Sequence, residues 1–193
     1  MLTICIPTYN YDVRPLVDEL LSQAINSKID VEILVADDAS TNLEIKQANK
    51  SIELNSNVTF IELEKNIGRA SIRNLLAQNS TYQHLIFLDC DTFPETSSFL
   101  NIYFKSRIEK GVVVGGLAYR SEMPNEEFIL RWTYGHERES PSEAQRMRNP
   151  YSSFMTGNFL IDKSVFVKLQ FDESLKGYGH EDTLFGISLE EKG

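Results

Sequence analysis

The sequence has few cysteines and no long apolar stretch, and both features limit the classes of protein to which the chain can belong. Its only cysteines are Cys5 and Cys90, and each lies inside an apolar run. Buried thiols without a disulfide are typical of a reducing compartment. No apolar stretch approaches the roughly 20 residues of a membrane-spanning helix, and residues 2–6 form a strand-like run without the features of a signal peptide. We therefore expect a cytoplasmic protein, and peripheral membrane contact stays open.

Excess positive charge and glycine-rich phosphate-binding motifs are also absent. The chain has 19 Lys and Arg against 28 Asp and Glu, a formal net charge of −9. This balance argues against nucleic acid as a partner, because phosphate backbones attract basic surfaces. Neither G-x-x-x-x-G-K-[ST] nor G-x-G-x-x-G occurs. We therefore expect a bound phosphate to be held by a metal ion or by local Arg and Lys side chains.

What the sequence does contain is an alternation of short apolar runs and helix-period segments. A length of 193 residues with 41% hydrophobic residues suits one globular domain. Strands are predicted at 2–6, 31–36, 58–63, 84–88, 112–118 and 154–161, and helices at 15–25, 43–54, 69–78, 99–108, 163–169 and 181–192. This alternation predicts an α/β fold with a mostly parallel sheet, whose ligands bind at the carboxyl ends of strands. The polar segment 119–152 is predicted to be an insertion or mobile loop.

Asp89 and Asp91 directly follow the predicted strand at 84–88. Side chains two residues apart on a strand point to one face, so the two carboxylates can converge while Cys90 turns away. Two close like charges repel each other, and a hard divalent cation relieves that repulsion. Taken alone, the motif is explained more simply as a strand that runs into an Asx turn.

Polar residues follow the other predicted strands of the first half as well. They are Pro7-Thr8-Tyr9-Asn10 after the first strand, Asp37-Asp38 after the second, and Gly68-Arg69 with Arg73 after the third. Parallel strands would bring all of these to one rim of the sheet. Taken singly, the acidic pair indicates a helix cap and turn, and Arg69 and Arg73 at i and i+4 indicate one solvated helix face. Tyr9 is equally well explained by core packing at a strand end.

A second acidic pair, Glu181-Asp182, begins the last predicted helix and follows Gly177-Tyr178-Gly179-His180. Acidic residues are favourable in the first turn of a helix, so the pair alone indicates a helix N-terminus.

Together, in this order and spacing, the motifs resemble the family 2 inverting glycosyltransferases, which use nucleotide-activated sugars. The resemblance runs from Pro7 to Asp182 and implies a Rossmann-like nucleotide-diphospho-sugar transferase (GT-A) fold. It implies one catalytic domain at 1–193, with a nucleotide-sugar-binding half at 1–118 and an acceptor-side half at 119–193. The implied activity is hexosyl or N-acetylhexosaminyl transfer in polysaccharide biosynthesis. The donor would be UDP-linked, the acceptor a saccharide or lipid-linked saccharide, and the metal Mn²⁺ or Mg²⁺.

The resemblance also implies a role for each matching residue. Asp182 matches the catalytic base, Asp91 the direct metal ligand, and Asp89 lies nearer the ribose and shares the metal. The residues that match donor-binding positions are Pro7, Thr8, Tyr9, Asp37, Asp38, Gly68, Arg69 and Arg73. Asp38 is favoured over Asp37 as the residue that binds the nucleotide base. The acceptor-side positions are Gly157, Asn158 and Glu181. Trp132 and His136 could also form a sugar platform on this side, although a buried Trp is more often part of the core, and His180 could be a hydrogen-bond partner.

Two other functions remain open from the sequence. A non-catalytic nucleotide-sugar-binding domain would need no base, and the Glu181-Asp182 pair argues against it. A sugar nucleotidyltransferase usually carries a Gly- and Arg/Lys-rich loop after the first strand, which Pro7-Thr8-Tyr9-Asn10 is not. Because members of this family continue beyond the Glu-Asp helix, the end of the chain at Gly193 leads us to expect a catalytic domain truncated at its C-terminus.

Overall fold

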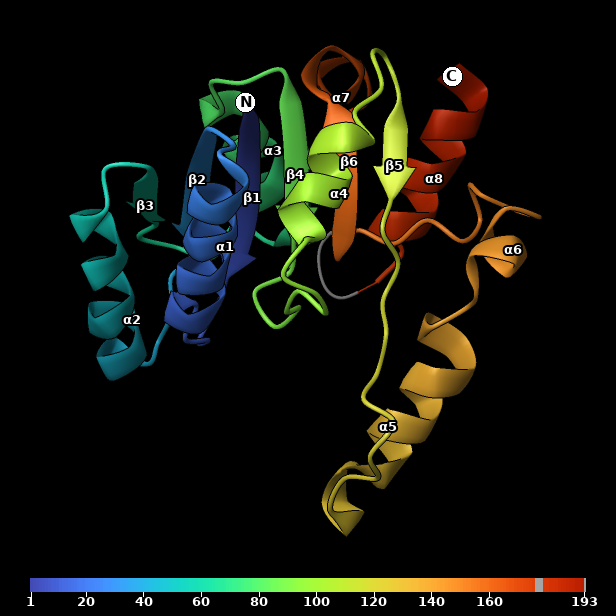
Figure 1. Cartoon of the computed structure of the whole chain (residues 1–193), viewed down its shortest axis with the longest axis horizontal. Helices are drawn as coiled ribbons and strands as arrows, with labels where there is room; N and C mark the ends of the chain where they lie inside the picture. The colour runs from blue at the N-terminus through green and yellow to red at the C-terminus, as the bar shows by residue number, and fades with distance from the viewer. Residues whose placement is uncertain (176–178, 193) are drawn as a thin grey trace.

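The computed structural model describes residues 1–175 and 179–192, and a single sheet lies at its centre (Figure 1). In this part of the chain the sheet has 6 strands in the order β3-β2-β1-β4-β6-β5. They are β1 Leu2–Thr8, β2 Val31–Asp37, β3 Val58–Glu62, β4 His84–Leu88, β5 Val112–Val114 and β6 Asn158–Asp162. The first four run parallel, and β6 runs antiparallel to its neighbours β4 and β5. The predicted α/β fold class is confirmed.

Helices cover both faces of the sheet. They are α1 Arg14–Ser27, α2 Leu43–Asn49, α3 Arg69–Asn79, α4 Phe99–Lys105, α7 Lys163–Leu169 and α8 Glu181–Lys192. Side chains of α1 and α4 pack with Ile4 and Ile6 on one face, and side chains of α3, α7 and α8 pack with Cys5 on the other. Alternate strand residues point to opposite faces, so a sheet covered on both sides needs the near-continuous apolar runs seen in the sequence.

Several predicted elements have different bounds in the structure, and three of them differ most. The helix predicted at 43–54 is α2 followed by a 3-10 helix, Lys50–Leu54. The strand predicted at 112–118 ends at Val114, and Gly116 soon after it has φ +78°, a conformation that leaves the extended strand. The strand predicted at 154–161 begins only at Asn158. Gly177 and Tyr178 of the predicted turn lie outside the described residues.

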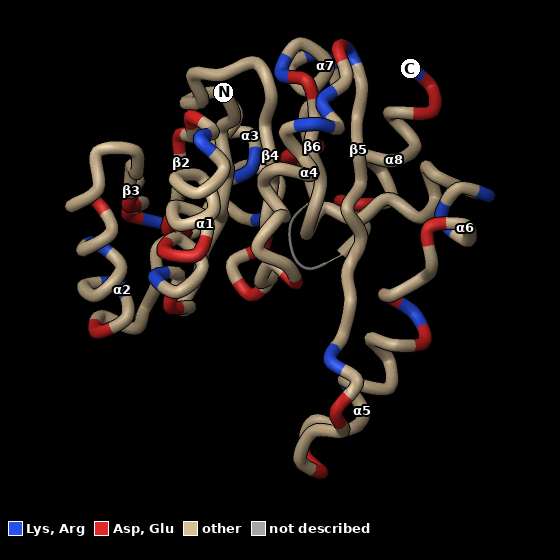
Figure 2. Tube along the Cα trace, in the orientation of Figure 1, with Lys and Arg blue, Asp and Glu red and all other residues tan. Residues whose placement is uncertain are grey.

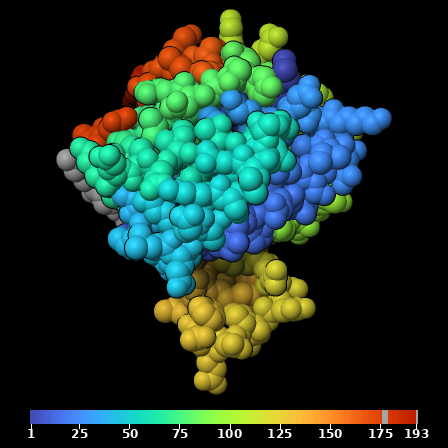
Figure 3. Space-filling model, turned by 90° about the vertical axis from the view of Figure 1, so that its left-hand side faces the viewer, coloured from blue at the N-terminus to red at the C-terminus, as the bar shows by residue number. Residues whose placement is uncertain are grey.

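The prediction of a loop at 119–152 is wrong in part, because this segment contains helices. They are the 3-10 helix η2 Glu126–Phe128, α5 Ile129–Tyr134, the π-helix η3 Gly135–Glu139 and α6 Glu143–Arg146. Residues 119–147, which we call the arm, leave the sheet after β5. In Figure 1 the part around α5 projects away from the sheet, whereas α6 lies closer to it, and in Figure 3 the projecting part forms a separate protrusion. These helices are mostly solvated, so they need no apolar stripe of the kind that would reveal them in a sequence.

Acidic segments lie in the loop after β4, at the lower edge of the sheet in Figure 2. This is the edge at which the parallel strands end, because their arrowheads point to it in Figure 1. Within residues 1–175 and 179–192, none of the helices combines the length and the apolar character needed to cross a bilayer.

Candidate active site

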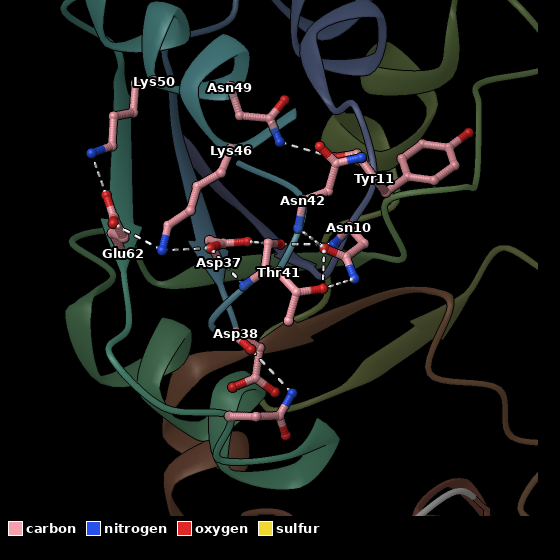
Figure 4. A network of polar contacts seen from close by, with 12 residues as sticks. Asn10, Tyr11, Asp37, Asp38, Thr41, Asn42, Lys46, Asn49, Lys50 and Glu62 are labelled. Carbon is pink, nitrogen blue, oxygen red and sulfur yellow. Dashed lines mark hydrogen bonds and ion pairs between the residues drawn. The ribbon is translucent and has the colours of Figure 1, made fainter. Parts of the chain in front are cut away.

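The loops after β1 and β2 are joined by polar contacts at the carboxyl rim (Figure 4). Asn10 adopts a left-handed conformation, φ 53°. In this position its backbone N–H donates to Ser40 Oγ at 2.7 Å, and its side-chain oxygen accepts from the Asn42 backbone N–H at 2.8 Å. The Asp38 backbone N–H donates to the Thr8 carbonyl at 2.9 Å. The two loops are therefore fixed against each other, which sets Thr8 beside Asp38.

The neighbouring acids Asp37 and Asp38 have different surroundings. Asp37 is fully buried and accepts hydrogen bonds from the Ser40 backbone N–H at 3.1 Å and from the Ser40 hydroxyl. Lys46 Nζ lies 3.9 Å from Asp37 and 2.9 Å from Glu62 (Figure 4). Asp37 thus anchors the loop that precedes α2.

Asp38 instead turns toward the start of α3. Its two carboxylate oxygens accept from the backbone N–H groups of Ile67 at 2.7 Å and Gly68 at 3.0 Å. Gly68 precedes α3 with φ +89°, a region that residues with a side chain rarely adopt. Asp38 therefore lies where the ends of β1, β2 and β3 meet.

Two arginines on α3 surround Asp89 with positive charge. Arg73 is only 2% exposed, and its Nη2 donates to Asp89 Oδ1 at 2.5 Å. Arg69 Nη2 lies 3.7 Å from Asp89 Oδ2, and Arg69 Nε lies 2.7 Å from Glu181 Oε1. The solvated helix face that the i and i+4 spacing alone indicates is therefore wrong for Arg73, whose charge is buried against the carboxylate.

Asp91 has open surroundings at the rim. It is exposed, and no hydrogen bond or ion pair engages its carboxylate among the residues that the structure describes. No group of three or more His, Cys, Asp or Glu side chains suited to a metal occurs in the described ranges. Two carboxylates still fit Mg²⁺ or Mn²⁺, because such ions keep waters and take further oxygens from a bound phosphate.

Asp182 lies in the first turn of α8. The Thr156 hydroxyl donates to Asp182 Oδ1 at 2.6 Å. Burial raises the pKa of Asp182 above its ordinary value, and the nearby Glu181 raises it further, while the Thr156 hydrogen bond and the charge of Arg73 lower it. A carboxylate with a raised pKa that remains hydrogen-bonded is suited to accept a proton.

The residues proposed for the acceptor side make different contacts in the structure. Gly157 lies against Asp89, since a Cβ added there would be 3.1 Å from Asp89 Oδ2. Asn158 accepts from the Tyr103 hydroxyl at 2.6 Å and donates to the Gly116 carbonyl at 2.8 Å, so its amide holds the base of the arm. Trp132 lies on the arm, where its indole N–H donates to the Arg120 carbonyl at 2.7 Å.

A single cavity of about 1870 Å³ joins most of these residues. Of the residues proposed from the sequence, it is lined by Pro7, Thr8, Tyr9, Asp38, Arg69, Arg73, Asp89, Asp91, Gly157, Asn158 and Asp182. Asp37, Gly68, Glu181 and Trp132 are not among the residues that line it. Its volume exceeds the roughly 300–1,000 Å³ of a pocket for one small molecule.

Several residues of this site escaped the sequence analysis. Thr156 contacts Asp182, and Arg120, Arg131 and Arg146 of the arm line the cavity. Thr156 immediately precedes the Gly157-Asn158 pair, which is the only local sign of its place. The arm arginines carry no such sign, because their approach to the cavity depends on how the arm folds.

Comparisons with known proteins identify the family of the chain. The family model described as "Glycosyl transferase family 2" matches residues 3–169. "Chondroitin synthase" of Pasteurella multocida (strain Pm70) is 25% identical over 228 residues, which cover 100% of this chain and 23% of that protein. "Glycosyltransferase GlyA" of Streptococcus pneumoniae serotype 4 is 26% identical over 106 residues, 54% of this chain and 15% of that protein. The chain thus spans less than a quarter of either relative.

Solved structures share the fold at lower sequence identity. The structure of S. aureus TarS 1-349 has a TM-score of 0.63 at 19% identity and covers 97% of this chain and 54% of that one. The same protein has been solved in complex with UDP-GlcNAc. The mannosyltransferase PcManGT from Pyrobaculum calidifontis, in complex with GDP-Man and Mn²⁺, has a TM-score of 0.61 at 18% identity and covers 94% of this chain and 49% of that one.

Proposed function

The chain belongs to glycosyl transferase family 2, and from this premise we propose that it transfers a sugar, with inversion, from a nucleotide-diphosphate donor to a saccharide or lipid-linked acceptor. One observation carries the proposal. Asp38, Asp91 and Asp182 are far apart in the sequence, yet all three line the same cavity. A donor needs a partner for its base, charge neutralisation at its diphosphate and a carboxylate near its sugar, and three separate acids around one hollow suit these needs.

On the donor side, residues 1–118 supply the groups that a nucleotide-sugar requires. Tyr9 is exposed at the cavity and offers a ring against which a base can pack. We propose that Asp38 accepts a hydrogen bond from an N–H group of the nucleotide base. Arg69 and Arg73 bring positive charge to the wall where a diphosphate would lie. We propose a UDP-linked donor, in keeping with the UDP-GlcNAc complex of TarS.

Asp91 would hold a divalent metal ion, and Asp89 would contribute a second carboxylate, which requires it to give up part of its pairing with Arg69 or Arg73. The open surroundings of Asp91 support this role, since a ligand that is free of protein partners can bind a cation without first breaking an ion pair. When bound, Mn²⁺ or Mg²⁺ supplies Lewis-acid stabilisation of the departing diphosphate. Arg69 and Arg73, which lie beside Asp89, would stabilise the negative charge that develops on the departing diphosphate.

Asp182 is the proposed general base. The acceptor hydroxyl oxygen forms a bond to the anomeric carbon while the bond from that carbon to the diphosphate oxygen breaks, and the hydroxyl proton passes to Asp182. Attack from the face opposite the leaving group inverts the anomeric configuration. Residues 119–193 would supply the acceptor side, through Gly157, Asn158, Glu181 and Trp132. For Glu181 this role requires its carboxylate to leave Arg69.

Replacement of the proposed general base, Asp182, tests the proposed function. Asp182→Asn should lower turnover at least about 100-fold, because a general base contributes roughly 10²–10⁴-fold. Donor binding should stay near the wild-type value, since the base contacts the acceptor. Both are measured with UDP-N-acetylglucosamine and Mn²⁺, by UDP release and by calorimetry. Asp18→Asn, at an exposed position of α1, is the matched control. Equal losses of binding and turnover would contradict the assigned role.

The metal role has its own test. Asp91→Ala should weaken Mn²⁺-dependent binding of UDP-N-acetylglucosamine, whereas Glu95→Ala, which removes the same charge from the same loop, should not. Calorimetry that gives an unchanged affinity for Asp91→Ala with Mn²⁺ present would count against the metal site.

A further inference from the structure

Two consecutive residues, Thr156 and Gly157, contact two carboxylates that have different proposed roles. Thr156 contacts the proposed base, Asp182, and Gly157 contacts the donor-side acid, Asp89. Thr156 is 1% exposed, and its hydroxyl donates to Asp182 Oδ1 at 2.6 Å. The Gly157 carbonyl accepts from the Asp89 backbone N–H at 3.0 Å, and the glycine lies against the Asp89 carboxylate. This short segment therefore spans the gap between the donor-side acid and the proposed base.

Apolar packing fixes the distance between α8 and this segment. A Cβ at Gly186 of α8 would overlap the Tyr151 carbonyl oxygen, so only a glycine allows the helix to approach so closely. One residue earlier, the Phe185 ring lies 5.3 Å from the Phe154 ring, centroid to centroid. Because these contacts hold α8 against residues 151–154, the Thr156 hydroxyl is held within reach of Asp182.

The charged groups around Asp182 do not orient its carboxylate by direct contact. Glu181 on the same helix is paired with Arg69, and Arg73 on α3 is bonded to Asp89. Arg73 acts on Asp182 through its charge alone, with no hydrogen bond between them among the contacts of the described residues. The Thr156 hydroxyl therefore fixes one carboxylate oxygen of Asp182, and the Thr156 backbone adds a further hydrogen bond to the same carboxylate.

We infer that Thr156 is a positioning residue whose hydroxyl orients the Asp182 carboxylate in the cavity and sets its place relative to Asp89. The inference rests on the proposed function, because its consequence for turnover requires Asp182 to be the base. A hydroxyl that donates to a carboxylate also favours the ionised form over the protonated form. Loss of the hydroxyl should therefore both misplace the base and make it harder to ionise.

The direct test is the titration of Asp182 in the intact chain. The protein is labelled with ¹³C at the Asp carboxyl carbons, and the Asp182 signal is identified by its disappearance in Asp182→Asn. Thr156→Val removes the hydroxyl and keeps the side-chain shape, so the titration midpoint should move upward. Thr156→Ser keeps the hydroxyl and should restore the midpoint. This measurement needs neither a donor nor an acceptor.

A matched control exists at the other end of the sheet. Thr3 is fully buried, and its hydroxyl donates to Glu32 Oε2 at 2.7 Å, the same kind of bond at nearly the same length. Thr3→Val should leave the Asp182 midpoint in place. An unchanged midpoint in folded Thr156→Val would overturn the inference. If the valine variant does not fold, Thr156→Ala provides the same comparison without adding bulk.

Turnover separates this inference from the proposed function. With UDP-N-acetylglucosamine and Mn²⁺, kcat of Thr156→Val should fall about 10-fold with an unchanged donor KM, the rate loss expected when one hydrogen bond to a charged group is removed. Thr156→Ser should recover most of it. If Thr156→Val shifts the titration midpoint of Asp182 but keeps the wild-type kcat, the positioning role of Thr156 is overturned. Undiminished turnover in Asp182→Asn would instead overturn the proposed function.

Discussion

The carboxyl rim of the sheet and the arm line the same cavity, yet different contacts hold them in place. At the rim, the strand ladders, two buried apolar clusters and the Arg73–Asp89 ion pair fix each side chain. In the arm, Trp132 and His136 contact the Arg120 carbonyl, and Arg131 pairs with Glu139 at an exposed site. The difference indicates that the proposed donor side is preorganised, whereas the proposed acceptor side depends on a segment with little core of its own.

Core packing should give the largest contrast between the two regions. Phe87 is fully buried between the rings of Phe159 and Phe166, at centroid distances of 4.9 and 5.1 Å. Phe87→Ala should lower the free energy of unfolding by about 3–5 kcal/mol. Phe128→Ala in the arm, at a side chain 54% exposed, should change it by less than about 0.5 kcal/mol. Urea denaturation measures both, and similar losses would mean that the arm is part of the core.

Ion pairs should give the next contrast. Arg73→Met leaves Asp89 without its closest cation and should cost about 2–3 kcal/mol of stability, because a partly buried carboxylate loses a charged hydrogen bond. Arg131→Met removes a comparable pair, but Arg131 has a side chain 59% exposed, and such pairs contribute less than about 1 kcal/mol. Thermal unfolding of the two variants compares them. A larger loss for Arg131→Met would reverse the assignment of the rigid region.

A smaller change sharpens the comparison within the rim. Gly157→Ala places a methyl group 3.1 Å from Asp89 Oδ2, so the carboxylate must yield by a few tenths of an ångström. We expect donor affinity to fall by up to about 10-fold, which corresponds to about 1.4 kcal/mol, with little change in melting temperature. Calorimetry with UDP-N-acetylglucosamine and Mn²⁺ measures the affinity. Unchanged binding would show that the Asp89 position tolerates this shift.

The pH dependence of stability should give the smallest effect. The pKa of Asp182 is raised in the folded protein from its ordinary value of 3.8, so the folded state holds its proton more tightly than the unfolded state. This contribution is fully present below pH 3.8 and is lost as the pH rises through the folded pKa. Asp182→Asn cannot ionise and should therefore be more stable than wild type at pH 7, with the gain fading in acid. Melting curves at several pH values check the sign.

The ends of β1, β2, β3 and β4 were predictable to within two residues because their pattern is local. Apolar runs followed by Asp38, Arg69 or Asp89 identify both the strands and the rim, since parallel strands end at one edge. The helices of the arm could not be found in the same way, because they bury no apolar stripe against a sheet. Instead, a capping box at Ser142 and Gln145 and contacts to the Arg120 carbonyl help to hold them.

The sequence by itself determined the α/β fold, the family and the acids that can share a cleft, because hydrophobic period and motif order are properties of the chain. Only the tertiary structure decided which of these acids are available. Asp37 is anchored by Ser40 and Lys46 and Glu181 by Arg69, whereas Asp91 remains open. The contact between Thr156 and Asp182 was likewise invisible in the sequence, because a hydrogen bond across 26 residues depends on the close packing of α8 against the segment before β6. Residue type sets what a side chain can do, and its neighbours in space set whether it is free to do it.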